Sequence, residues 1–308
     1  MPMPHRTFAQ VARRRLTGKE GRERIREVRA LLDELPDYRN GPYADLRKWL
    51  LGEIEETRVR SSAVQRDSIA VRREGVAQVA LVGPPNVGKS SLLQALSDIQ
   101  IRTGDYAFTT LRPVPALTRI HGVLVQLVEI PGLIRGASED RGGGRALLGV
   151  LRSADAILYC TRADADPAQL DVVRDEVAIA GIDRPSAIAV TRADEASPEA
   201  IARLRAAWSL PVVAVSILDD ASLAAFREVA WALTGLITVR LRHAGKVDPE
   251  PVALPAGATV ADVAAGVHKG LASTFAGARI WGASARFDGQ RVGRGHVVAD
   301  GDVVELVP

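Results

Sequence analysis

The sequence predicts an α/β protein built on a doubly wound, mostly parallel sheet, with a helical hairpin before the sheet and a small α+β unit after it. Three observations predict this fold class. Short apolar runs alternate with helical stretches in the middle of the chain, a glycine-rich turn joins the first run to a helix, and the rhythm changes after Gly235. The expected domains are residues 1–75, 76–236 and 237–308.

The N-terminal region has two helical patterns. Apolar residues recur at steps of three and four from Gly21 to Leu35, and again from Tyr43 to Ile54, which puts each set on one helical face. Pro36 and the turn-rich "PDYRNGP" separate the two patterns, and the second helix is expected to end near Arg60. The region therefore predicts a helical hairpin.

This region is also basic. Residues 1–75 contain 17 Lys and Arg against 12 Asp and Glu, although the whole chain has a formal net charge of only +3. The excess is compatible with a nucleic-acid-binding face and equally with an ordinary solvated helical surface.

The central region alternates strands and helices. The apolar runs "AQVALV", "VLVQLVEI", "AILYC", "SAIAV" and "PVVAV" are predicted strands, with predicted helices at 90–96, 167–180, 197–208 and 221–233. Mostly apolar runs of this kind, buried on both faces and with helices between them, are typical of a parallel sheet.

The C-terminal region has another order. Two strand-like segments, "ITVRLRHAG" and "PVALPAGA", precede a helix predicted from about Thr259 to Leu271, and "ARIWG", "ARFDGQRVG" and "DVVELV" follow. Short strands around one helix, joined by glycine turns, predict an α+β unit.

The single cysteine and the hydropathy bear on location. Cys160 lies inside an apolar run, so no intrachain disulfide forms and a buried reduced thiol is expected. No stretch reaches the roughly 18 apolar residues of a membrane span, and the N-terminus lacks the apolar core of a secretory signal. We expect a soluble, cytoplasmic protein.

A phosphate-binding motif follows the first predicted strand. The segment "GPPNVGKSS" fits G-x-x-x-x-G-K-[ST] between a strand and a helix, which predicts a P-loop NTPase. Its N–H groups can surround a phosphate, the lysine supplies a cation, and the first serine hydroxyl can ligate Mg²⁺. The predicted nucleotide-binding residues here are Gly83, Pro85, Asn86, Val87, Gly88, Lys89, Ser90 and Ser91.

Two later segments predict a site that senses the γ-phosphate. "FTTLRP" supplies Thr109 and Thr110, of which Thr110 is the predicted ligand of Mg²⁺ and contact of the γ-phosphate. "EIPGLI" ends a strand with Glu129 near the metal and the Gly132 N–H near the γ-phosphate. Such loops order on contact with the γ-phosphate and relax when it is lost. Lys89, Thr110 and Gly132 are therefore candidate catalytic residues.

The tetrapeptide TRAD occurs twice, at 161–164 and 191–194. Each copy ends a predicted strand, at the edge where open parallel sheets bind ligands. The first continues into Asp166 and Pro167, a pattern typical of a helix N-cap. The second is followed by one more strand, which ends in "VSIL" with Ser216.

The order of these motifs resembles that of translation-factor-type GTPases. The runs "YAFTTLRPVPA" and "EIPGLIRGASEDRGGGRALLGVLRSADAILY" are similar to the Obg superfamily, specifically to its developmentally regulated GTP-binding (DRG) branch. Residues 251–307 resemble the C-terminal TGS domain of that branch, a ubiquitin-like β-grasp module. The resemblance covers roughly residues 40 to 308. DRG proteins carry an extra domain before the base-reading motif, for which the 58 residues between Gly132 and Thr191 leave no room.

The resemblance implies which TRAD copy reads the base. Thr191, Arg192 and Asp194 correspond to the base-reading motif, Ser216 and Ile217 to the last loop of the pocket, and Asp164 is structural. A carboxylate accepts two hydrogen bonds from guanine, whereas adenine leaves its charge unpaired. GTP is therefore expected over ATP. Arg192 replaces the usual Lys and can lay its guanidinium over the purine.

The resemblance also implies how hydrolysis is assisted. Leu133 stands where many signalling GTPases carry a water-orienting Gln, so backbone groups and a cation are expected to help instead. Asn86 matches the P-loop Asn that ligates K⁺ in potassium-activated GTPases, although it can equally serve only the turn. Glu129 replaces the family's Asp, and its extra methylene is expected to slow turnover.

The expected activity is hydrolysis of GTP to GDP and phosphate with Mg²⁺ and K⁺, as a switch on the ribosome or another RNA assembly. The N-terminal helices and the TGS unit are the candidate contacts, unless they only pack on the G domain or on a protein cofactor. Neither a membrane nor DNA is an expected partner. The alternatives are a nucleotide-locked binding scaffold without turnover and a TGS-bearing ATPase, which Asp194 disfavours.

Overall fold

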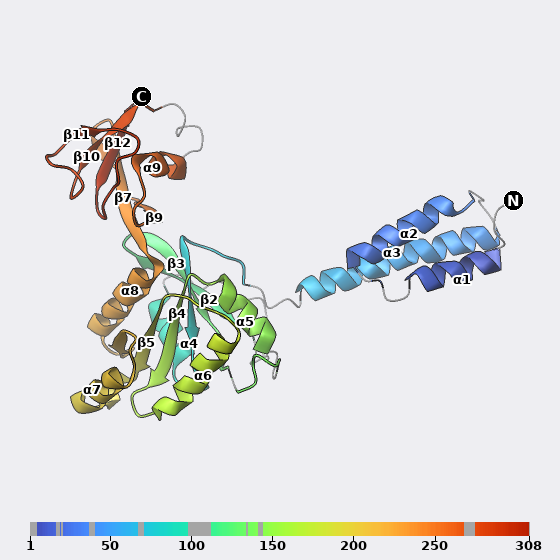
Figure 1. The fold of residues 1–308 in the computed structure, drawn as a ribbon, viewed down its shortest axis with the longest axis horizontal. Coiled ribbons are helices and arrows are strands. Elements are labelled where there is room, and N and C mark those ends of the chain that lie inside the picture. The colour runs from blue at the N-terminus through green and yellow to red at the C-terminus, as the bar shows by residue number, and fades with distance from the viewer. Residues whose placement is uncertain are drawn as a thin grey trace. The chain divides into compact units, whose positions relative to one another are not determined.

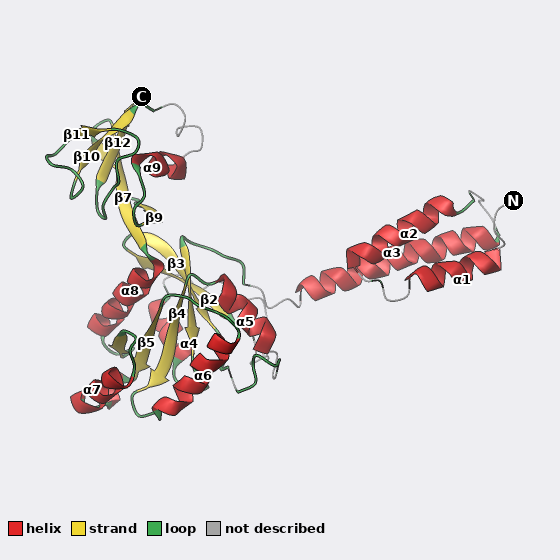
Figure 2. Ribbon diagram, viewed as in Figure 1, coloured by secondary structure: helices red, strands yellow, loops and turns green. Residues whose placement is uncertain are grey.

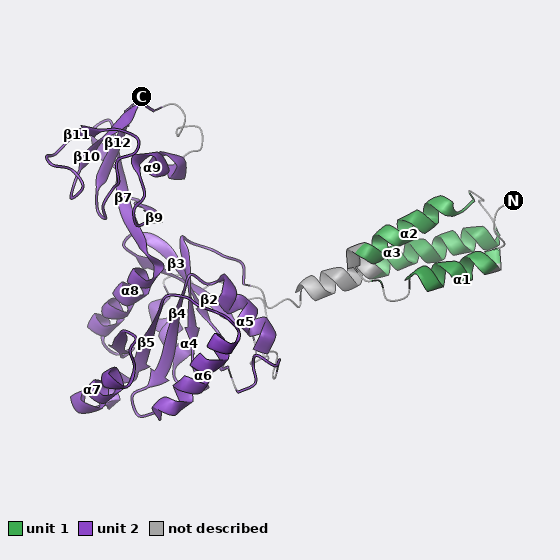
Figure 3. Ribbon diagram, in the orientation of Figure 1, with its two compact units in different colours: residues 1–68 green, residues 69–308 purple. Residues whose placement is uncertain are grey.

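The structure is a computed structural model that describes residues 5–16, 19, 21–36, 41–66, 71–97, 112–133, 135–140, 144–267 and 275–307. The chain divides into two compact units, residues 1–68 and residues 69–308 (Figure 3). Each unit has its own buried apolar core.

The first unit contains the helices α1 (His5–Leu16), α2 (Gly21–Glu34) and α3 (Pro42–Arg66) (Figure 1). The predicted hairpin is confirmed as α2 and α3, but α3 continues beyond Arg60 to Arg66. Helix α1 was not predicted. It belongs to the same core, because Phe8, Ala12 and Leu16 recur every four residues and are buried against the other two helices.

Ion pairs bind the helices of this unit to one another. The Arg15 guanidinium pairs with Glu27 at 2.7 Å and with Glu34 at 2.8 Å. Arg24 pairs with Glu53 on α3 at 2.6 Å. Part of the basic excess in the sequence is therefore engaged within the unit itself.

The second unit begins with a β-sheet (Figure 2), whose six strands lie in the order β2-β3-β1-β4-β5-β6. The antiparallel pair is β2 with β3, and the other neighbours are parallel, which confirms the predicted mostly parallel sheet. The strands are β1 (Ala77–Val82), β2 (Val114–Ile120), β3 (Val123–Glu129), β4 (Ala156–Arg162), β5 (Ser186–Thr191) and β6 (Val212–Val215).

Helices cover both faces of this sheet, as predicted. One apolar core joins a sheet face to α4 (Lys89–Leu96) and α8 (Asp220–Thr234). The other core joins the opposite face to α5 (Gly144–Ser153), α6 (Pro167–Ile179) and α7 (Pro198–Ala207). The carboxyl ends of the parallel strands therefore lie together at one edge of a rigid layered structure.

A smaller sheet follows α8, after Gly235 ends that helix in a left-handed conformation. Its order is β11-β10-β12-β7-β8, with β9 also paired to β7. Helix α9 (Val260–Val267) packs on one face, and the predicted end of this helix at Leu271 lies outside the described residues. The strands are β7 (Leu236–His243), β8 (Lys246–Val247), β9 (Val252–Pro255), β10 (Gly277–Trp281), β11 (Gln290–Val292) and β12 (Val303–Val307).

Among the described residues, no helix combines the length and the apolar character needed to cross a membrane.

Candidate functional site

The phosphate loop joins β1 to α4 at the carboxyl edge of the sheet. Gly83 lies so close to β4 that an added Cβ would come within 2.2 Å of the Cys160 carbonyl oxygen, so this position accepts only glycine. Gly88 precedes α4 with a φ of 84°, and Asn86 has a φ of 62°. Pro85, Asn86, Ser90 and Ser91 are exposed, whereas Val87 is buried.

The lysine of the motif closes the loop. Lys89 is buried, and its Nζ donates hydrogen bonds to the carbonyl oxygens of Gly83 at 3.0 Å and Pro84 at 2.8 Å. Burial lowers the pKa of Lys89, against the influence of Cys160 and Glu129. Burial also raises the pKa of Cys160 to about 12, so the single thiol stays protonated beside the loop.

The structure brings two predicted metal ligands together. The Ser90 hydroxyl, in the first turn of α4, donates a hydrogen bond of 2.7 Å to Oε1 of Glu129, the last residue of β3. A hydroxyl and a carboxylate oxygen this close form a donor set that suits Mg²⁺. Within the described residues, no group of three or more His, Cys, Asp or Glu side chains could hold a metal ion.

The Pro-Gly segment contacts the phosphate loop directly. An added Cβ at Gly132 would lie 2.8 Å from the Cγ of Pro85, so the backbone of Gly132 packs directly against the Pro85 ring. Leu133 is buried in the core beneath the segment. Thr109 and Thr110 lie outside the described residues.

The second TRAD copy is joined to the phosphate loop. Buried Thr191 donates a hydrogen bond of 2.6 Å from Oγ1 to the Val87 carbonyl oxygen. Arg192 has a left-handed φ of 53°, and its guanidinium pairs with Glu195 at 3.2 Å. Asp194 follows in a short 3-10 helix, η2 (Ala193–Glu195), and is exposed.

The loop after β6 forms the neighbouring corner of the site. Ser216 is buried, and its hydroxyl accepts a hydrogen bond of 3.1 Å from the Leu218 N–H. Its backbone N–H donates to the Ser222 hydroxyl at 2.9 Å, which fixes the turn into α8. Ile217 is half exposed, at 48%. The turn therefore presents backbone and an apolar side chain at the sheet edge.

In the first TRAD copy the carboxylate of Asp164 is paired within the copy itself. Asp164 accepts two hydrogen bonds from Arg162, at 2.7 and 2.6 Å, and this partner lowers the pKa of Asp164. Asp166 caps α6 by accepting a bond of 3.0 Å from the Ala168 N–H, as its sequence pattern predicts. The first copy is thus built as a turn.

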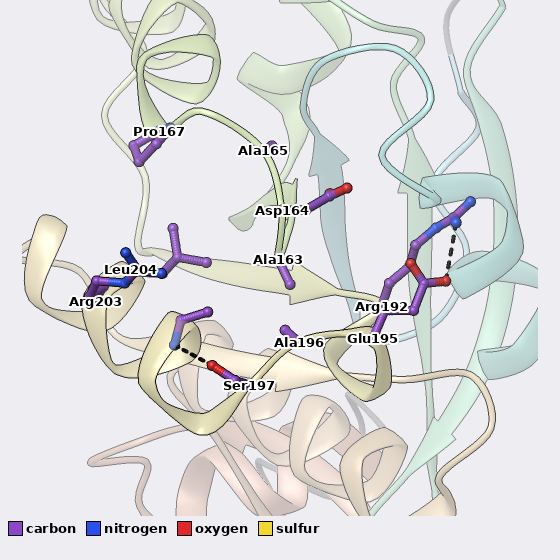
Figure 4. Close-up of a pocket in the computed structure, with 11 residues that line it drawn as sticks. Ala163, Asp164, Ala165, Pro167, Arg192, Glu195, Ala196, Ser197, Arg203 and Leu204 are labelled. Atoms are coloured by element: carbon purple, nitrogen blue, oxygen red, sulfur yellow. Dashed lines mark hydrogen bonds and ion pairs between the residues drawn. The ribbon is translucent and has the colours of Figure 1, made fainter.

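A cavity of about 500 Å³ lies between the two copies (Figure 4). Asp164 lines one side, Arg192 and Glu195 line another, and Arg203 and Leu204 of α7 close it. Asp194 and Ser216 are not among its described lining residues. The cavity therefore shares only Arg192 with the predicted base-reading residues.

A residue that sequence reasoning missed holds the segment after Leu133. Glu176 of α6 is buried, and its carboxylate accepts bonds from the Gly136 N–H at 2.7 Å, the Ser138 N–H at 2.9 Å and the Ser138 hydroxyl at 2.7 Å. These bonds lower the pKa of Glu176, that from Gly136 most. No local sequence pattern signals a contact across some 40 residues.

Two families match the chain. Residues 78–192 match a family described as 50S ribosome-binding GTPase, and residues 237–308 match the TGS domain. Both matches agree with the fold of the second unit.

The chain is also similar to complete proteins. An uncharacterized GTP-binding protein of Halobacterium salinarum is 30% identical, over 77% of this chain and 85% of its own length. An uncharacterized GTP-binding protein of Methanocaldococcus jannaschii is 28% identical, over 91% and 92%. The developmentally-regulated GTP-binding protein 2 homolog of Dictyostelium discoideum is 27% identical, over 80% and 87%.

Proposed function

Because the chain belongs to the DRG-type branch of the Obg-superfamily GTPases, we propose that it hydrolyses GTP in a Mg²⁺-dependent reaction and acts as a switch on the ribosome or another RNA assembly. The observation that carries the hydrolytic part is the 2.7 Å contact between Ser90 and Glu129 beside Lys89. This contact supports the proposal because it joins two proposed metal ligands where the phosphate loop meets β3.

The reaction is attack of water on the γ-phosphorus with departure of GDP. The loop N–H groups and Lys89 stabilise the negative charge that shifts toward the β-phosphate oxygens. Leu133 is buried, so we propose the Gly132 N–H as the contact of this segment with the γ-phosphate. Thr110 is the proposed contact from the preceding loop.

Ser90, Glu129 and Thr110 would hold Mg²⁺, which supplies charge neutralisation on the triphosphate when it is bound. Glu129 would hold it through a longer arm than Asp gives, so we propose slow or factor-dependent turnover. Asn86 would ligate K⁺. Its left-handed φ already accounts for an Asn at this turn, so potassium dependence is the observation that decides its role.

Asp194 is the proposed reader of guanine, with Thr191 as its anchor. Asp194 is exposed at the sheet edge, whereas Asp164 is occupied by Arg162. Arg192 would have to leave Glu195 to lie over the purine, a small cost for an exposed ion pair. Ser216 and Ile217 would border the base.

The ribosomal part of the proposal is supported by the family description of residues 78–192, and the TGS domain is a proposed contact. The first unit is a weaker candidate contact than its charge suggests, because Arg15 and Arg24 are held by glutamates within it. A protein cofactor is a further proposed partner, and a cytoplasmic location remains a prediction.

A nucleotide-locked scaffold is the second candidate function, and Glu129 at the metal side is the observation that favours it. Phosphate release from GTP and from ATP, with and without K⁺ and purified ribosomes, separates the candidates. A switch releases phosphate from GTP, and faster with ribosomes. Tight GTP binding without any release selects the scaffold, and equal use of ATP rejects Asp194 as the base reader.

A further inference from the structure

The smaller sheet, formed by β7 to β12, has an open face on the side opposite helix α9. Helix α9 and the buried side chains of Val239, Ile280 and Val304 form its covered face. Because side chains alternate along strands, the residues between these apolar ones point to the other side. The residues of this open face include Arg240 and Arg242 of β7, Arg279 and Trp281 of β10, Arg291 of β11, and Val303 and Glu305 of β12.

The strand register concentrates positive charge there. Arg279 of β10 lies directly opposite Arg291 of β11, in an antiparallel pair. Like charges directly opposite each other destabilise a sheet, so folding alone does not favour this arrangement. On its other side, Arg279 lies opposite Glu305 of β12, which is the one acidic residue on these strands.

The arginines are available for a ligand. Arg240, Arg279 and Arg291 are exposed, and within the residues that the structure describes none of the three forms an ion pair or a side-chain hydrogen bond. This contrasts with Arg15 and Arg24 in the first unit, which glutamates hold.

An aromatic ring lies on the same face. The guanidinium of Arg242 stacks over the ring of half-buried Trp281, with its central carbon 4.2 Å from the ring centroid. The Nε of Arg242 is buried and has no hydrogen-bond partner among the residues that the structure describes. Trp281 faces Val303, which in turn faces Arg240, so ring and cations form a continuous surface across three strands.

We propose that this open face binds single-stranded RNA, with the arginines on its phosphates and a base stacked beside Trp281 and Arg242. Guanidinium groups match the geometry of phosphate oxygens. Flat aromatic and guanidinium surfaces accept any base, so the binding is independent of sequence. This inference rests on the proposed role at an RNA assembly and names the contact.

RNA fits this surface better than an acidic protein segment does. The carboxylates of an acidic segment would use the arginines but supply no aromatic ring for the Trp281–Arg242 stack. Duplex RNA keeps its bases paired and offers no splayed base for the ring. Both therefore serve as competitors in the test.

The test uses the full chain loaded with GDP and a labelled, mixed-sequence single-stranded RNA, with binding followed by fluorescence anisotropy at several KCl concentrations. The variant is Arg279→Ala with Arg291→Ala. The matched control is Arg203→Ala with Arg205→Ala, which removes the same charge from exposed positions of α7. Removing facing like charges does not threaten folding, and equal melting temperatures check this.

We expect the sheet variant to bind RNA about tenfold or more weakly and to lower the salt slope by roughly 1.4, since each phosphate contact to a single strand contributes about 0.7. The control should bind like the wild-type chain. Trp281→Leu should weaken binding with an unchanged salt slope, and Trp281→Phe should restore most of it.

Equal RNA affinity of the sheet variant and the control would overturn the inference while leaving the RNA role intact. Equal competition by duplex RNA or by polyglutamate would overturn it as well. Wild-type protein that releases phosphate from GTP but binds no RNA would reject both the contact and the RNA part of the proposed function. Unaltered GTP turnover in the sheet variant is the expected internal control.

Discussion

The Thr191 hydroxyl lies 2.6 Å from the Val87 carbonyl oxygen and donates a hydrogen bond to it across 104 residues of sequence. The bond joins the end of β5 to the phosphate loop, so the proposed base reader and the phosphate cradle keep a fixed separation. Nucleotide affinity should depend on this separation, because both ends of the ligand must be met at once.

Thr191→Val removes the donor and keeps the shape. The buried Val87 carbonyl then loses a partner, which costs about 1 to 3 kcal/mol, so we expect GDP affinity to fall about tenfold. Titration with a fluorescent GDP analogue measures this. Thr191→Ser retains the hydroxyl and should stay close to the wild-type affinity, and a Val variant that binds equally well would contradict the coupling.

Asp194→Asn should weaken GTP binding and favour xanthosine triphosphate. The new amide donor opposes the amino group of guanine but can bond to the carbonyl that xanthine carries in its place. Asp164→Asn is the matched control, since its carboxylate is bound to Arg162. Competition between the two triphosphates measures the selectivity. The same selectivity in both variants would reject Asp194 as the base reader.

Turnover should be severalfold faster in KCl than in NaCl at equal ionic strength if Asn86 ligates K⁺ beside the phosphates. Phosphate release at saturating GTP measures it.

The left-handed φ of Asn86 complicates an alanine variant, because alanine is strained there. Asn86→Gly keeps the backbone relaxed and deletes the amide, so it should lose the potassium effect while still binding GDP. If Asn86→Gly keeps the potassium effect, the Asn86 side chain does not ligate K⁺ and serves only the turn.

Glu129→Asp should raise turnover with Mg²⁺, because it shortens the arm by one methylene and restores the length usual in the family. Glu129→Gln should lower it, since the charge is lost. Single-turnover measurements across Mg²⁺ concentrations separate metal affinity from rate. An unchanged rate in Glu129→Asp would show that the arm length does not limit the reaction.

The bonds that Glu176 makes to segment 136–138 should make the stability of the folded chain depend on pH. Its pKa is lowered in the folded chain, so its stabilising contribution is complete above the ordinary value of 4.5 and is lost as the pH falls through the folded pKa. Glu176→Gln lacks this contribution at every pH. Urea unfolding should therefore show a difference between the two proteins that shrinks from pH 7 toward pH 3.5. A constant difference would contradict the assignment.

Local patterns predicted the elements of the fold well. Residues 79–82 and 187–190 are apolar throughout, and such runs identify buried parallel strands without further information. Helix α1 was missed because Phe8, Ala12 and Leu16 form a narrow stripe among arginines, which becomes a core only when two other helices face it. The strand β8, two residues long, carries no periodicity at all.

The site was predictable only where a motif reports it. The phosphate loop and the Pro-Gly segment are contiguous, so their chemistry can be read residue by residue. The bonds from Thr191 to Val87 and from Gly136 to Glu176, like the facing pair Arg279 and Arg291, depend on how distant segments are placed. Such contacts are consequences of topology, which a single sequence does not encode in any local pattern.

The packing of Gly132 against the Pro85 ring has a mechanical consequence. Neither glycine nor a proline ring can change rotamer to relieve a closer approach, so the two loops should move together. A shift of tenths of an ångström where the terminal phosphate sits would be passed along the chain rather than damped. Positions 85 and 132 should accordingly tolerate change only as a pair, with any gain in bulk at one matched by a loss at the other.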